Sequence, residues 1–111
     1  MSNLTPSEIV HTLSTISKEI DEKTAELAEL DEAQVRARQA FKRRHAEVFL
    51  TTDGSMDVRR YTADSETSDL CLAYEIAEQQ HRACVAQLKA LRDRLEVGRS
   101  IGALVRLEWQ A

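Results

Sequence analysis

The chain has 111 residues, of which 42% are hydrophobic and 31% charged, so its length fits one domain, residues 1–111. It contains no run of about 18 apolar residues, which excludes a membrane-spanning helix and a membrane partner. Its net charge of −4 disfavours a protein dominated by nucleic-acid binding, and its polar start shows no secretory signal. We therefore expect a cytoplasmic protein.

The first predicted helix covers about residues 5–53. Thr5, Pro6 and Glu8 have the pattern of a capping box, because Thr5 is placed to accept from the Glu8 amide and Pro6 is preset for the first helical position. Further along, apolar positions recur at alternating spacings of four and three, which is typical of a coiled-coil seam. The seam positions are Ile9, Leu13, Ile16, Ile20, Lys23, Leu27, Leu30, Gln34, Ala37, Phe41, Arg44 and Val48.

The next segment, about residues 54–65, is predicted to hold a turn and a short helix. Gly54 can adopt the positive φ that ends a helix, and Ser55 can cap the next helix. The alternative is a β-hairpin over residues 48–61 around the same glycine, as in the helix, hairpin, helix plan of prefoldin subunits. We prefer the helical alternative because the helical stripe continues into this segment and the second arm of the hairpin lacks a clean apolar alternation.

The second predicted long helix covers about residues 66–109. Several Asp, Ser and Thr residues before it can cap its start. Its seam has the same alternation of four and three as the first helix. The seam positions are Leu70, Tyr74, Ala77, His81, Cys84, Leu88, Leu91 and Leu95.

Charge predicts that the two long helices pair antiparallel. Residues 1–33 carry eight acids and two bases, whereas residues 81–111 carry six bases and three acids. Folding the chain back on itself also places the basic run at 36–44 opposite the acidic run at 64–78. Since an exposed ion pair contributes only about 0.3–0.5 kcal/mol, these blocks choose orientation and register more than they stabilise.

The predicted fold is therefore all-α, an antiparallel coiled-coil hairpin of two long helices. Two helices share one seam and bury little apolar surface, so we expect a homo-oligomer, most simply a dimer that forms a four-helix bundle. The C-terminal segment is apolar around most of its circumference, and its two glycines allow close approach of another helix. The predicted oligomer interface is Gly98, Ile101, Gly102, Leu104, Val105 and Trp109. The alternatives are a partly exposed tail and a helix break at Gly98.

No catalytic or cofactor-binding motif is visible, so we expect a protein that is not an enzyme and carries no cofactor. His81 and Cys84 are half of a conceivable metal site, whose other two ligands would have to come from His45, Cys71 or a second chain. We prefer to interpret His81 as a polar seam residue that fixes register, and both cysteines as small buried hydrophobes. No catalytic, cofactor-binding or metal-ligating residue is therefore assigned.

A dense basic run in the first helix makes nucleic acid a candidate partner, because clustered cations can follow a phosphate backbone. The acidic residues of the second helix can instead neutralise this run, and aromatic side chains that would stack on bases are scattered. The self-paired interpretation is preferred. The candidate polyanion contacts are Arg36, Arg38, Lys42, Arg43 and Arg44.

Two motifs carry a resemblance to a known group of proteins. The first joins Phe49 and Leu50 to Gly54, Ser55 and Arg59, and the second is Leu91-Arg92-x-x-Leu95-x-Val97-Gly98-Arg99-Ser100-x-Gly102-Ala103-x-Val105-Arg106-x-Glu108. Over residues 34–111 the chain resembles small helical proteins of tailed bacteriophages, particularly phages of actinobacteria. The resemblance implies a viral protein of unassigned activity that acts in the host cytosol, and it favours helix over hairpin at 48–61.

Three functional hypotheses follow. The first is a non-enzymatic interaction or oligomerisation module that binds an unidentified host or phage protein. The second is an accessory of DNA replication or recombination, or an acidic inhibitor of a host DNA-processing enzyme in the manner of phage Gam-type proteins. The third is a prefoldin-like holdase, which requires the β-hairpin.

Overall fold

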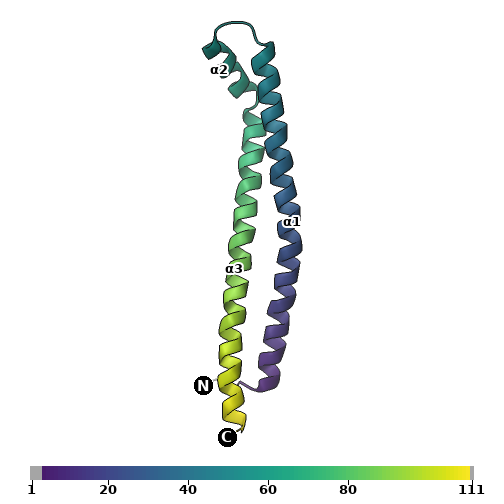
Figure 1. Cartoon of the computed structure of the whole chain (residues 1–111), viewed down its shortest axis with the longest axis vertical. Helices are drawn as coiled ribbons and strands as arrows, with labels where there is room; N and C mark the ends of the chain where they lie inside the picture. The colour runs from purple at the N-terminus through teal and green to yellow at the C-terminus, as the bar shows by residue number, and fades with distance from the viewer. Residues whose placement is uncertain (1–3, 111) are drawn as a thin grey trace. The chain divides into compact units, whose positions relative to one another are not determined.

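The computed structural model describes residues 4–110, and 93% of these residues are helical. Its elements are α1 (Pro6–Thr51), α2 (Met56–Glu66) and α3 (Ser68–Gln110), and the described residues contain no strand (Figure 1). The predicted all-α class and the two long helices are confirmed, as is a short helix between them. The β-hairpin alternative is wrong, because its two arms belong to the end of α1 and to α2.

The helix ends form as their sequences predict. The amide of Glu8 donates to Thr5 Oγ1 and the amide of Thr5 donates to Glu8 Oε2, both at 3.2 Å, so the capping box closes reciprocally. Gly54 has a φ of 120°, and Ser55 Oγ accepts from the amide of Val58 at 3.3 Å. A side chain is strained at such a φ, so glycine allows the connection between α1 and α2 to be short.

The chain forms two compact units, which we describe separately. Unit 1 comprises residues 1–27 and 84–111, so it contains the first half of α1 and the second half of α3. Here Cys84 Sγ donates to the carbonyl oxygen of Lys23 at 3.6 Å, while Gly102 lies against Ile9. A later residue of α3 therefore contacts an earlier residue of α1, which confirms the predicted antiparallel direction of the helices in this unit.

The core of unit 1 is one seam between these two helix segments. Cys84 and Leu88 are among its most buried side chains, as predicted from their spacing. The seam of α3 then continues past Leu95 at the same rhythm. The buried and half-buried positions that continue it are Gly98, Gly102 and Val105.

Unit 2 comprises residues 28–83 and holds the end of α1, all of α2 and the start of α3. Phe41 and Tyr74 stack with ring centroids 6.3 Å apart, and His81 Nε2 lies 3.7 Å from Asp31 Oδ1. The later residue of α3 again contacts the earlier residue of α1, so the helices are antiparallel in this unit as well. The second of them supports the prediction that His81 is a polar member of the seam.

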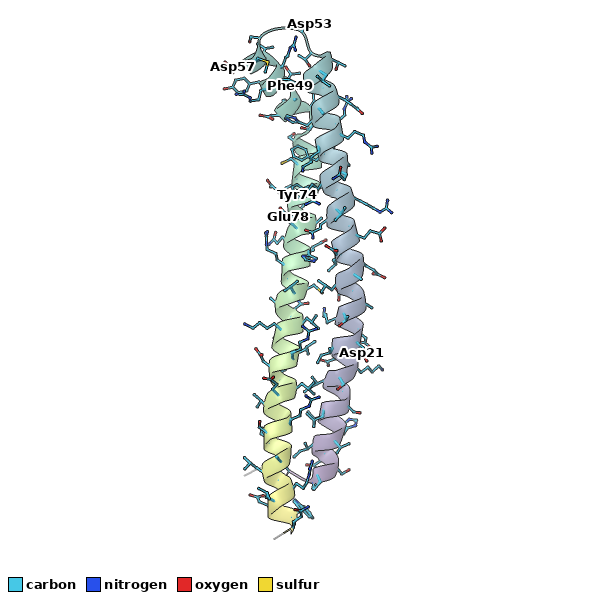
Figure 2. All side chains as sticks on the ribbon, viewed as in Figure 1. Asp21, Phe49, Asp53, Asp57, Tyr74 and Glu78 are labelled. Carbon is cyan, nitrogen blue, oxygen red and sulfur yellow. The ribbon has the colours of Figure 1, made fainter. Side chains whose placement is uncertain are left out.

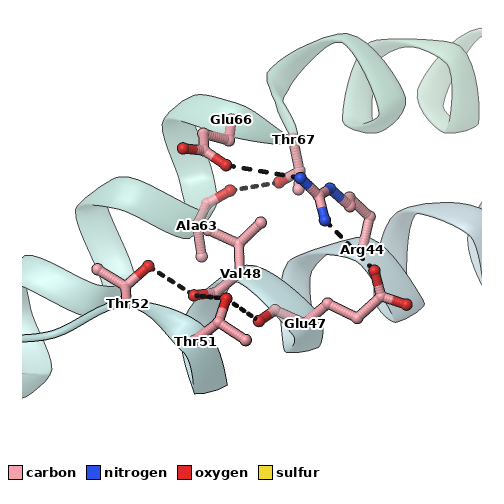
Figure 3. A network of polar contacts seen from close by, with 8 residues as sticks. All are labelled: Arg44, Glu47, Val48, Thr51, Thr52, Ala63, Glu66 and Thr67. Carbon is pink, nitrogen blue, oxygen red and sulfur yellow. Dashed lines mark hydrogen bonds and ion pairs between the residues drawn. The ribbon is translucent and has the colours of Figure 1, made fainter.

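A break in the helix divides α2 from α3 at Thr67, which is fully buried. Its Oγ1 donates to the Ala63 carbonyl at 2.6 Å, so the hydroxyl is satisfied within the turn (Figure 3). Ala63 and Val48 are also buried here, which fixes α2 against the end of α1. The Arg44 guanidinium, 3.4 Å from Glu47 and 3.9 Å from Glu66, borders this contact (Figure 3).

The predicted seam of α1 is wrong at one position. The Arg44 side chain is 53% exposed, whereas that of His45 is 30% exposed and reaches Asp64 at 2.7 Å. The half-buried stripe thus runs from Ala37 to Phe41 to His45, with two successive spacings of four. Such a stutter lets a seam follow the 3.6-residue period of a straight helix, and it turns Arg44 outward.

Candidate functional site

A groove runs along one side of unit 1, between the first half of α1 and the second half of α3. It consists of two neighbouring hollows that share Glu19 and Arg94 in their lining. We call them the apolar hollow and the acidic hollow, and together the groove. Two helices line each hollow, so both are open along one side of the helix pair.

The apolar hollow has a volume of about 630 Å³. Helix α1 contributes mostly polar, uncharged side chains to it, and α3 contributes the aliphatic Val97 and Ile101 together with the charged Asp93 and Arg94. Its lining residues are His11, Thr12, Thr15, Ile16, Glu19, Asp93, Arg94, Val97, Gly98 and Ile101. A hollow of this size can receive several apolar side chains.

The acidic hollow has a volume of about 460 Å³ and lies at the next turns of both helices. Its α1 wall carries Glu19, Glu22 and Glu26, one helical turn apart. Lys23 also lines it, but the Lys23 ammonium lies 2.9 Å from Glu26, and this hydrogen bond raises the pKa of Lys23. Its α3 wall is formed by Gln87, Ala90, Leu91 and Arg94.

The α3 wall continues as an exposed apolar stripe. Val97, Ile101 and Leu104 are spaced by four and three, so they lie on one face of the helix, next to the seam. Their exposed fractions are 58%, 40% and 64%. On α3, the opposite flank of the seam carries mostly charged residues. The side of α3 next to the groove is therefore apolar from Val97 to Leu104, whereas the other side of the helix is mostly charged.

The predicted oligomer interface divides into two groups. Gly98, Gly102 and Val105 face α1 of the same chain, so the close approach that the glycines predicted is made within unit 1. The predicted alternative of a helix break at Gly98 is wrong, because α3 continues to Gln110. Ile101 and Leu104 remain exposed beside the groove, and Trp109 is 64% exposed near the end of α3.

The five basic residues of the predicted polyanion contact, all in unit 2, do not form one face. Arg44 lies beside Glu47 and Glu66, and Arg36 Nη2 is 2.7 Å from Glu32. Arg38 is half-buried, and its Nε is buried without a hydrogen-bond partner among the described residues. Lys42 and Arg43 are exposed and have no ion pair within the described part of the chain. Only these two cations of the basic run are therefore both exposed and without an ion pair among the described residues.

The two cysteines lie in different surroundings. Partial burial and the nearby Glu75 carboxylate raise the pKa of the Cys71 thiol, which keeps it protonated near neutral pH. Cys84 is buried at the seam, where it packs as the sequence predicts. Within residues 4–110 no group of three or more His, Cys, Asp or Glu side chains lies close enough together to hold a metal ion.

The sequence predicted Ile101 and Leu104 as interface residues but did not predict Val97 or the acidic wall of the groove. Glu19, Glu22 and Glu26 were counted only as part of an acidic block that orients the helices. The sequence does contain a signal for this wall, because each of these glutamates immediately precedes a seam position of α1. Arg94 and Val97 likewise precede seam positions of α3. In an antiparallel pair these preceding positions meet on the same side of the seam.

No helix within residues 4–110 is both long and apolar enough to span a membrane. No protein-family model, curated protein or solved structure matches the chain.

Proposed function

We propose that this chain is a non-enzymatic protein-interaction module whose groove receives a helix from another polypeptide. The observation that carries this proposal is the exposed row of Val97 and Ile101, which line the apolar hollow, and Leu104, which follows on the same face of α3. Isolated apolar side chains on a surface need no explanation, but a row of them beside a hollow is typical of an interaction site.

A helix is the occupant that fits this surface best. Ridges of one helix pack into grooves formed by others, and apolar anchors at spacings of three and four match that geometry. Fully burying one aliphatic side chain contributes about 1.5–3 kcal/mol, so covering three half-exposed ones contributes roughly half of that for each. The third helix would complete a three-helix core that the two helices of unit 1 leave open on one side.

The test uses a fluorescent synthetic peptide of about 18 residues, with leucines at helical spacing and glutamines elsewhere, long enough to form a helix on docking. We expect it to bind the full chain and to lose affinity by about tenfold when Val97→Asp places a charge in the groove. Leu107→Asp is the matched control, because Leu107 is 64% exposed on α3, close to the 58% of Val97, but lies outside the groove. Equal losses in both variants, or no binding, would contradict the proposal.

A second candidate is self-association, in which two copies form the dimeric four-helix bundle. The exposed fractions of Leu104, Leu107 and Trp109, each 64%, favour it, because they surround the last turns of α3. Light scattering after size-exclusion chromatography tests it. A dimer that Leu104→Asp converts to a folded monomer would support self-association, and a monomeric wild-type chain across the accessible concentration range would exclude it.

A further inference from the structure

We propose that the helix received by the groove is cationic, with its basic side chains against the acidic hollow and its apolar side chains in the apolar hollow. This inference rests on the proposed function and names the partner class of the same site. The partner is thus a basic amphipathic helix, and the charge of the groove is what selects it.

Carboxylates outnumber cations in the lining of the groove. Four carboxylates line it, those of Glu19, Glu22, Glu26 and Asp93, against two cations. One cation, Lys23, forms an ion pair with Glu26. The other, Arg94, has no ion pair within 4.0 Å among the described residues. A docked helix excludes water, so carboxylates left without cations would make docking unfavourable.

The two hollows follow one another along the helix pair. Glu19 to Glu26 spans seven residues of α1, or about 10 Å, and Val97 to Leu104 spans a similar length of α3. A docked helix would therefore present apolar side chains over two turns and basic side chains over the next two. Such separation along its length differs from the usual amphipathic pattern of two opposite faces, and it defines the direction in which the helix docks.

The same charges make a second copy of this groove a poor occupant. If two copies faced each other with their helices parallel, acidic hollow would meet acidic hollow. If the helices ran antiparallel, the carboxylates of Glu19 and Glu22 would be placed against Val97 and Ile101 of the other copy. Each arrangement buries more carboxylates than cations, since each copy brings four carboxylates and only Lys23 and Arg94 as cations, and this excess is unfavourable.

The experiment compares three peptides of the same leucine pattern, in which the residues facing the acidic hollow are lysine, glutamine or glutamate. We expect the lysine peptide to bind the full chain at least about tenfold more tightly than the glutamate peptide, with the glutamine peptide between them. The advantage of lysine should shrink as salt rises from about 0.02 to 0.5 M. Equal affinities would overturn the cationic partner while leaving the proposed function intact, whereas no binding of any peptide would overturn both.

Two variants of the chain locate the effect. Glu22→Lys should weaken the lysine peptide by about fivefold or more, because it replaces a carboxylate of the acidic hollow. Asp21, labelled on α1 in Figure 2, is exposed and does not belong to the lining of either hollow. Asp21→Lys makes the same change of charge one residue earlier and should have little effect. Equal weakening by both variants would show a non-local charge effect and overturn the inference. A dimer that excludes the peptides would show that a second copy is the occupant.

Discussion

Gly98 of α3 lies against Leu13 of α1 so closely that a Cβ atom at position 98 would stand 2.6 Å from Leu13 Cδ2. Alanine at this position gains about 1 kcal/mol of helix propensity, but it must displace the leucine. We expect Gly98→Ala to be at least about 1 kcal/mol less favourable in the wild type than in a Leu13→Ala background. Urea unfolding of the four chains of this double-mutant cycle gives the coupling energy, and a coupling near zero would show that the contact is not made.

The reciprocal cap at the start of α1 predicts a local loss of stability. Thr5→Ala removes the acceptor of the Glu8 amide and should cost about 1 kcal/mol. Ser7→Ala, at an exposed neighbouring position with no such bond, should be close to neutral. Thermal unfolding followed by circular dichroism measures both changes. If Ser7→Ala proves as costly as Thr5→Ala, the capping box does not stabilise the helix.

The two cysteines should differ in reactivity. Burial and Glu75 hold the pKa of the Cys71 thiol above its ordinary value, so its thiolate fraction should be small at pH 7 and rise only in more alkaline solution. Cys84 is 2% exposed and should react only on unfolding. Alkylation with iodoacetamide, followed by mass spectrometry across a pH series, gives both rates. Glu75→Gln removes one cause of the shift, so it should move the Cys71 profile toward lower pH.

The raised pKa of Cys71 also has a defined consequence for stability. A thiol whose pKa is higher in the folded state binds its proton more tightly there than in the unfolded chain. Its contribution is therefore fully present below the thiol pKa of the unfolded chain and is lost as pH rises through the folded pKa. Cys71→Ala should remove that component of the alkaline loss of stability, as measured by urea unfolding. An unchanged pH dependence would argue against a shifted thiol.

The basic run of α1 should bind nucleic acid weakly. Ion pairs and burial engage Arg36, Arg38 and Arg44, which leaves Lys42 and Arg43 as the exposed cations without an ion pair among the described residues. We expect no mobility shift of duplex or single-stranded DNA at about 0.15 M salt, where few phosphate contacts give little affinity. A stable complex at that salt concentration that Lys42→Glu and Arg43→Glu abolish would instead favour the DNA-accessory hypothesis.

Much of the fold follows from the sequence, because local patterns determine it. The cap at Thr5, the turn at Gly54 and the seam around Leu88 each depend on nearby residues and a known helical period. Arg44 was misplaced because the strict seven-residue repeat drifts from the period of a straight helix, and His45 took the seam position once Asp64 could reach it.

The groove was harder to foresee than the helices. Its outline depends on how far apart α1 and α3 lie, and the glycines at 98 and 102 set that distance for part of unit 1. From sequence those glycines predicted close approach by another helix but did not show that the helix belongs to the same chain. Leu104 and Trp109 were likewise predicted as interface residues, but their exposure could be known only from the packed structure.

The most direct test of a groove that docks a basic helix is a titration of ¹⁵N-labelled chain with the lysine peptide, followed by amide chemical shifts. We expect the largest amide shifts on residues of the groove, including Glu22, Val97 and Ile101, and small shifts on Asp21 and Leu107. Saturable binding with the largest shifts in unit 2, or shifts of similar size on the groove and on Leu107, would contradict it.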